Sequence, residues 1–206
     1  MKDYLRCIKS VDDSVGRIVD ALKAAGLEDN TVVIYSSDQG FFNGEHGWFD
    51  KRWIYEESLH MPFIIRWPSV VKPGTRFTPF IQNIDYAPTF VEMAGGQTPD
   101  GLHGRSLVPI LRGQSPPDWR RSVYYHYYDP GVHHVPKHYG VRTDRFTLVR
   151  FYETEEWELF DNQKDHFQLR NVYADPEYGD FVVQLKTELA RLRQFYRDTD
   201  GPELAK

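Results

Sequence analysis

The sequence contains a single cysteine, no long apolar run and no excess of positive charge. A single cysteine, Cys7, occurs among 206 residues, so no disulfide can form within the chain and the fold must rest on a hydrophobic core. The 25 Lys and Arg residues are outnumbered by 30 Asp and Glu residues, which leaves no basic stripe for a nucleic acid. No apolar stretch approaches the roughly 18 residues of a membrane span, and the charged first residues lack the apolar run of a signal peptide. These features leave the compartment open.

The first half of the sequence has the pattern of an α/β protein. Apolar residues recur at steps of three and four over residues 5–22, which predicts a helix with one buried face. We expect Cys7 to be a buried residue of this helix and Gly26 to end it. The runs TVVIY (31–35) and FIIRW (63–67) show no alternation, which predicts strands covered on both faces, as in a parallel sheet.

The second half changes character near residue 119. Before that point, Asp85 is expected to cap a helix that ends at Gly95. After it, four short aromatic segments alternate with turn residues, which predicts a small antiparallel sheet over 122–161. Apolar residues at helical spacing over 181–195 predict a C-terminal helix that covers this sheet. We therefore expect an α/β core over 1–118 and a small α+β subdomain over 119–206.

The stretch SSDQGFFNGEHGWFDKR (36–52) directly follows the first predicted strand. Ligands of open α/β sheets bind where strands end. Asp38 and Gln39 offer the hard oxygen ligands that calcium or magnesium prefers, and His46 and Lys51 offer hydrogen-bond donors for an anion. Together they predict a metal-assisted site for an oxyanion. Each side chain alone also fits a helix cap, a satisfied loop histidine or a solvated lysine, so the residues by themselves leave an ordinary polar loop open.

Several longer motifs resemble the type I sulfatases. The stretch from 36 to 68 is similar to the family's strand ending in Ser-Asp-(Asn, His or Gln)-Gly, followed by Gly-Glu-His-Gly, a lysine and a Tyr-Glu-Glu-Ser-like helix. Segments NIDYAPTFVEMAG, GLHGRSLVPIL, HYGVRTDRFTLVRFY and WELFDNQKDHFQLRNVYADPEY also resemble the family. The resemblance implies an alkaline-phosphatase-like fold, with a mostly parallel sheet flanked by helices and a small C-terminal antiparallel sheet, that hydrolyses sulfate esters.

The resemblance also implies roles for individual residues. Asp38 and Gln39 would be calcium ligands, Lys51 would hold a sulfate oxygen, and His46 would bind substrate or support the loop. A cation and an ammonium group neutralise the sulfate oxygens and stabilise charge that develops during transfer. Gln39 stands where many relatives have Asn or His, which keeps an oxygen donor but alters its reach.

One motif of the family does not occur in this sequence. The family's nucleophile is a formylglycine made from the first residue of Cys-X-Pro-Ser-Arg, whereas Cys7 is followed by Ile-Lys-Ser. We interpret the chain as the C-terminal portion of a sulfatase and expect it to be inactive alone. Its two strands would expose an apolar edge. We therefore expect either an N-terminal sulfatase half or self-association to cover it.

The tyrosine-rich segment 124–143 contains His126, His138 and Arg142. It resembles the part that lines the substrate pocket in sulfatases acting on amino sugars and glycosaminoglycans, and aromatic faces with cationic donors suit a sulfated sugar. A zinc site would lack cysteines and regular ligand spacing, and a plain aromatic strand pair with solvated histidines also fits. The alternatives in function are a phosphate or phosphonate ester hydrolase of the same superfamily and a non-catalytic remnant that binds a glycan or a partner.

Overall fold

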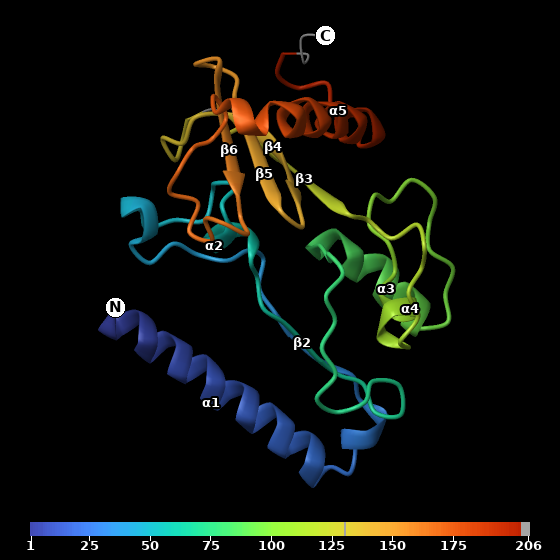
Figure 1. Cartoon of the computed structure of the whole chain (residues 1–206). Helices are drawn as coiled ribbons and strands as arrows, with labels where there is room; N and C mark the ends of the chain where they lie inside the picture. The colour runs from blue at the N-terminus through green and yellow to red at the C-terminus, as the bar shows by residue number, and fades with distance from the viewer. Residues whose placement is uncertain (130, 203–206) are drawn as a thin grey trace.

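The computed structural model describes residues 1–129 and 131–202, and it begins with a long helix that stands apart from the C-terminal sheet (Figure 1). Helix α1 spans Lys2–Ala24. Gly26 ends it with φ +66°, and the N–H of Leu27 reaches the carbonyl oxygen of Leu22 at 2.9 Å, as the sequence predicted. No residue of α1 is buried and Cys7 is exposed. The prediction that Cys7 is buried was wrong, because the apolar face of α1 meets β1 and β2 only across a groove and Cys7 is not part of that groove's lining.

The two predicted strands of the first half pair with each other, but in opposite directions. Strand β1 (Val33–Ser36) runs antiparallel to β2 (Phe63–Arg66), with Val33 opposite Arg66. The parallel arrangement expected of these two runs was wrong. An unbroken apolar run indicates cover on both faces, but it carries no information on strand direction. Here the connection over 37–62 returns the chain beside β1, without a crossover helix.

Three short helices follow in the first half of the chain. They are α2 (Glu56–Leu59), α3 (Tyr86–Met93) and α4 (Val108–Leu111). Gly95 ends the turn after α3 with φ +74°, as expected. Asp85 does not cap α3 with its side chain. Its buried carboxylate instead accepts the N–H of Gln82 at 2.7 Å and that of Arg105 at 2.8 Å and pairs with Arg120, because a guanidinium and two amides satisfy a buried carboxylate.

The C-terminal sheet confirms the antiparallel prediction. Its strands lie in the order β3 (Ser122–Tyr127), β4 (His138–Thr143), β5 (Phe146–Phe151) and β6 (Glu156–Asp161), each antiparallel to its neighbour. Helix α5 (Gly179–Phe195) crosses one face of the sheet (Figure 1). Its leucines at 185, 189 and 192 pack on Leu148 and Leu159 to form the main core. No helix in the described part of the chain is long and apolar enough to cross a bilayer.

The second face of this sheet holds the segment that precedes α2. Ile54 is completely buried against Val149 and Phe151 of β5, and Tyr55 packs against Phe160 of β6. Because both faces of β5 are covered, all six of its residues are buried. The polar loop after β1 is thereby fixed to the C-terminal sheet through residues 53–55.

Candidate functional site

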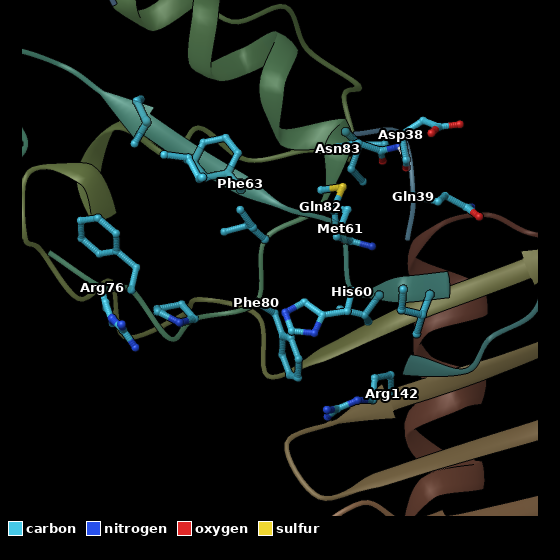
Figure 2. A pocket seen from close by; sticks show the side chains of 18 of the residues that line it. Asp38, Gln39, His60, Met61, Phe63, Arg76, Phe80, Gln82, Asn83 and Arg142 are labelled. Atoms are coloured by element: carbon cyan, nitrogen blue, oxygen red, sulfur yellow. Dashed lines mark hydrogen bonds between the residues drawn. The ribbon is translucent and has the colours of Figure 1, made fainter. Parts of the chain in front are cut away.

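A cavity of about 1670 Å³ lies between the loop after β1, the segment 59–84 and the C-terminal sheet. Figure 2 shows Asp38, Gln39, His60, Phe80 and Arg142 on its walls. Four of the seven predicted site residues line this cavity, namely Asp38, Gln39, His126 and Arg142. The other three, His46, Lys51 and His138, are not part of its lining.

Lys51 joins the site through Asp38. Its ammonium group forms an ion pair with Oδ2 of Asp38, whose side chain is 67% exposed. The hydrogen bond from Lys51 holds the pKa of the Asp38 carboxyl below its usual range. The loop after β1 thus brings together the two opposite charges that the sequence placed 13 residues apart.

Helix α2 connects the predicted site residues to one another. Ser58 is completely buried, and its Oγ lies 2.6 Å from the carbonyl oxygen of Lys51 and 3.2 Å from Oε1 of Gln39. The N–H of Gly40 donates to the carbonyl oxygen of Ser58 at 2.7 Å. Gly40 has no room for a side chain, since a Cβ would lie 2.0 Å from the carbonyl oxygen of Glu57. Sequence analysis included Ser58 in the Tyr-Glu-Glu-Ser-like helix but assigned it no role.

Arg142 is held rigidly on the cavity wall. Its Nε donates to Oε1 of Glu56 at 2.5 Å, and its guanidinium lies 5.3 Å above the ring of Phe80. The Nη1 atom is buried without a hydrogen-bond partner among the described residues. Glu56 is therefore a second residue of α2 that the sequence did not single out, and it fixes the direction of a predicted substrate ligand.

His126 is anchored by the segment that follows α5. Its Nδ1 lies 2.6 Å from Oδ2 of Asp198, and its Nε2 lies 3.2 Å from the hydroxyl of Tyr152. The hydroxyl of Tyr124 also donates to Asp198 at 2.5 Å. A carboxylate only accepts hydrogen bonds, so Nδ1 of His126 carries a hydrogen. The side chain of His126 is only 5% exposed, and it forms part of the cavity lining.

His46 lies in an aromatic cluster beside the loop. Its ring stacks on Tyr55 at 4.9 Å and on Trp48 at 5.8 Å, and its Nε2 lies 3.5 Å from Oε2 of Glu57. Its φ of +55° places it in the left-handed region that a tight loop requires. This position agrees with support of the loop, one of the two roles expected for His46.

His138 is a core residue. Its ring is completely buried, stacks on Trp53 and Tyr125 at 5.5 Å each, and donates from Nδ1 to the carbonyl oxygen of Pro136 at 2.8 Å. Burial lowers its pKa to about 4. The predicted substrate contact of His138 finds no support in this position, because β4 turns the ring towards residues 53–55 instead of the cavity.

The donors of Asp38 and Gln39 fit part of a calcium site. A carboxylate and an amide oxygen are ligands of the type that calcium prefers, but calcium takes about six to eight of them. Within residues 1–129 and 131–202, no three His, Cys, Asp or Glu side chains gather as ligands of one metal ion. Any calcium held here would need additional ligands from elsewhere.

The antiparallel sheet with its covering helix, and the charged loop fixed to that sheet, agree with the C-terminal region of an alkaline-phosphatase-like sulfatase that the sequence motifs resemble. Residues 44–195 match the family model of the N-sulphoglucosamine sulphohydrolase C-terminal region. The chain belongs to this family of sulfatases.

Similar proteins include sulfatases that act on amino sugars and a phosphonate monoester hydrolase. The chain is 44% identical to an N-acetylglucosamine-6-O-sulfatase of Bacteroides thetaiotaomicron, over 98% of this chain and 37% of that protein. It is similar to the structure of BT4656 in complex with its substrate D-glucosamine-2-N,6-O-disulfate, with a TM-score of 0.93 and 42% identity over 98% of this chain and 42% of that one. A phosphonate monoester hydrolase from Silicibacter pomeroyi is more distant, with a TM-score of 0.81 and 31% identity over 92% of this chain and 40% of that one. The chain thus spans about two fifths of the length of these proteins.

Proposed function

We propose that this chain forms the C-terminal part of a sulfatase that hydrolyses sulfate esters of N-acetylglucosamine-type sugars. The observation that carries the proposal is the 44% identity to an N-acetylglucosamine-6-O-sulfatase across 98% of the chain. The human N-acetylglucosamine-6-sulfatase, 37% identical over 59% of this chain and 22% of its own length, supports the same type of sugar.

Lys51 would bind an oxygen of the sulfate group. Its ammonium is already oriented by Asp38 and its main chain by Ser58. A fixed ammonium stabilises negative charge that grows on the sulfate oxygens, without the cost of reorganising water during the reaction. These contacts of Lys51 with Asp38 and Ser58 also fix the distance between its ammonium group and the side chains of Asp38 and Gln39.

Asp38 and Gln39 would hold calcium, which when bound would polarise a sulfate oxygen as a Lewis acid. Their oxygens supply only part of the ligands that calcium takes. The remaining ligands and the formylglycine nucleophile would come from polypeptide outside these 206 residues, since no Cys-X-Pro-Ser-Arg motif occurs within them.

Arg142 and His126 would recognise the sugar. Arg142 offers a fixed guanidinium at the cavity wall, and the nearby rings of Tyr124, Tyr125 and Tyr128 also line the cavity. Sugars bind to aromatic faces through their apolar C–H surfaces and to charged donors through their oxygens. This combination favours a sulfated carbohydrate over a small aryl sulfate.

The uncovered face of α1 and of the β1–β2 pair would pack against the rest of the sulfatase fold. Ile8, Ile18 and Ile64 are 47%, 59% and 65% exposed, and a groove of about 370 Å³ between α1 and the strands is lined mainly by apolar side chains. An apolar surface of this kind favours a protein partner. Self-association is the alternative occupant of this face.

Neither alternative function has comparable support. A phosphonate monoester hydrolase shares the fold, but at 31% identity. A non-catalytic remnant would not need the ion pair of Lys51 with Asp38, which lies on the cavity wall.

The experiment is to mix this chain with a polypeptide carrying the part of the B. thetaiotaomicron relative that it does not match, and to assay the mixture with calcium. We refer to this mixture as the complemented enzyme. Release of sulfate from N-acetylglucosamine-6-sulfate by the mixture, and by neither polypeptide alone, supports the proposal. Binding of the two folded polypeptides without sulfate release contradicts it, and faster cleavage of a phosphonate monoester favours the alternative.

A further inference from the structure

The chain after α5 turns back and is tied to the C-terminal sheet over residues 198–202, which we call the C-terminal strap. Arg193 of α5 is buried and donates to the carbonyl oxygens of Asp200 and Pro202, each at 2.6 Å. The hydroxyl of Tyr139, a buried residue of β4, donates to the same oxygen of Pro202 at 3.0 Å. Two buried side chains therefore hold the main chain of the strap at three points, and two of these bonds are strengthened by the charge of the guanidinium.

The strap brings one carboxylate to the cavity wall. Oδ2 of Asp198 lies 2.6 Å from Nδ1 of His126 and accepts from the hydroxyl of Tyr124 at 2.5 Å, and both of these residues line the cavity. Oδ1 of Asp198 accepts from the main-chain N–H of Asp200 at 3.0 Å. Burial raises the pKa of Asp198, but the hydrogen bonds from Tyr124 and His126 outweigh it and hold the pKa below its usual range. Asp198 is therefore an ionised carboxylate at neutral pH, and both of its oxygens accept hydrogen bonds.

These contacts use both ring nitrogens of His126. Because an ionised carboxylate only accepts, Nδ1 carries a hydrogen in the neutral ring as well as in the charged one. Nε2 lies 3.2 Å from the hydroxyl of Tyr152, which can donate to the neutral ring or accept from the charged one. The ring also stands edge-on to Tyr128 of the cavity wall, with centroids 5.1 Å apart. The part of His126 that remains for a ligand is its carbon surface.

We propose that Asp198 is a positioning residue of the sugar site, which fixes the direction and the tautomer of His126 so that this ring meets a sugar through its carbon atoms. The sugar contact rests on the proposed function, but the tautomer does not. An aromatic ring of this kind packs on the C–H surface of a sugar, as do its tyrosine neighbours. The matched family model ends at residue 195, so the strap adds residues to the site that this match does not cover.

Nuclear magnetic resonance that correlates ring hydrogens with ring nitrogens tests the tautomer on the full chain, without calcium or substrate. His126→Phe identifies the signals of His126. Above the titration of the ring, the wild type should carry its hydrogen on Nδ1. Hydrogen on Nε2 in the wild type overturns the proposal, and this arm does not depend on the folding of any Asp198 variant.

Asp198→Asn should move that hydrogen to Nε2. The main-chain N–H of Asp200 still requires an acceptor, so it binds the amide oxygen and the amide nitrogen takes the place of Oδ2. That nitrogen donates to Nδ1 of His126, which must then be unprotonated. The matched control is Asp200→Asn, because this side chain is exposed on the same strap and the strap contacts of Asp200 use its main chain. Hydrogen that stays on Nδ1 in Asp198→Asn, or that moves equally in Asp200→Asn, contradicts the proposal.

Kinetics of the complemented enzyme test the link to the sugar. Asp198→Asn should raise KM for N-acetylglucosamine-6-sulfate roughly fivefold or more and leave kcat within about twofold, because the contacts of Lys51 with the sulfate are unchanged. Asp200→Asn should change neither constant. An unchanged KM in Asp198→Asn, or an equal rise in both variants, contradicts the role of Asp198 at the sugar site. A complemented enzyme without turnover contradicts the proposed function, whereas the tautomer of His126 still decides whether Asp198 positions this ring.

Discussion

Protonation of His138 should destabilise the fold at mildly acidic pH. The ring is completely buried, its Nδ1 hydrogen is used by the carbonyl oxygen of Pro136, and its Nε2 has no hydrogen-bond partner in the described part of the chain. A proton on Nε2 would therefore create a buried charge without a partner. This is why burial lowers the pKa of His138 from 6.5 to about 4.

The sign and size of the effect follow from the two pKa values. A histidine with a lowered folded pKa contributes full stability above pH 6.5, and this is lost progressively as pH falls towards 4, because the unfolded chain binds the proton first. At about 1.4 kcal/mol per pKa unit, the loss reaches about 2 kcal/mol at pH 5 and about 3 kcal/mol below pH 4.

Urea unfolding of the wild-type chain and of His138→Phe at pH 7.5 and pH 5 measures this contribution. The variant keeps an aromatic ring but cannot titrate, so its free energy of unfolding should fall less between the two pH values, by about 2 kcal/mol. The exposed His166, changed to Gln, serves as the control and should leave the pH dependence unaltered. Equal pH dependence in wild type and His138→Phe would refute a buried, neutral His138.

The remaining predictions concern the site and the sheet. Lys51→Ala in the complemented enzyme should lower kcat roughly 100-fold or more, whereas Lys164→Ala should not; near-normal turnover would remove Lys51 from the sulfate site. Asp38→Ala should abolish any rise in melting temperature that calcium gives the complemented enzyme, and an equal rise in both proteins would leave Asp38 without a metal role. Arg142→Ala should reduce kcat/KM for a sulfated sugar roughly tenfold more than for a small aryl sulfate; equal losses would contradict sugar recognition. Gly140→Ala should lower the free energy of unfolding by about 2 kcal/mol or more, since its Cβ would lie 2.3 Å from a carbonyl oxygen of β5, and calorimetry showing no loss would contradict the register of β4.

Patterns that depend on local sequence could be predicted, and this covers most of the C-terminal region. The alternation and turns of 122–161 gave an antiparallel sheet, and the apolar spacing of 181–195 gave its covering helix, because both signals come from one face meeting a core. Gly26 and Gly95 could be placed as helix ends for a different local reason, because the positive φ of a helix end favours glycine.

Features that depend on distant neighbours could not be predicted. The direction of β2 relative to β1 is set by the path of the connecting loop, and the exposure of Cys7 by its place on α1 outside the groove between α1 and the two strands. The local sequence also could not distinguish the roles of the two histidines. His126 and His138 lie in one tyrosine-rich segment, but His126 lines the cavity and His138 is buried in the core. Ser58 and Glu56 act through contacts 7 to 86 residues away, which no local pattern encodes.

The most direct test of the central claim is a chimera in which this chain replaces the matching segment of the B. thetaiotaomicron N-acetylglucosamine-6-O-sulfatase. We expect the chimera, assayed with calcium, to release sulfate from N-acetylglucosamine-6-sulfate at a rate within roughly tenfold of the parent, and Lys51→Ala to remove this activity. A folded chimera that binds calcium but releases no sulfate, or one whose activity survives Lys51→Ala, would contradict it.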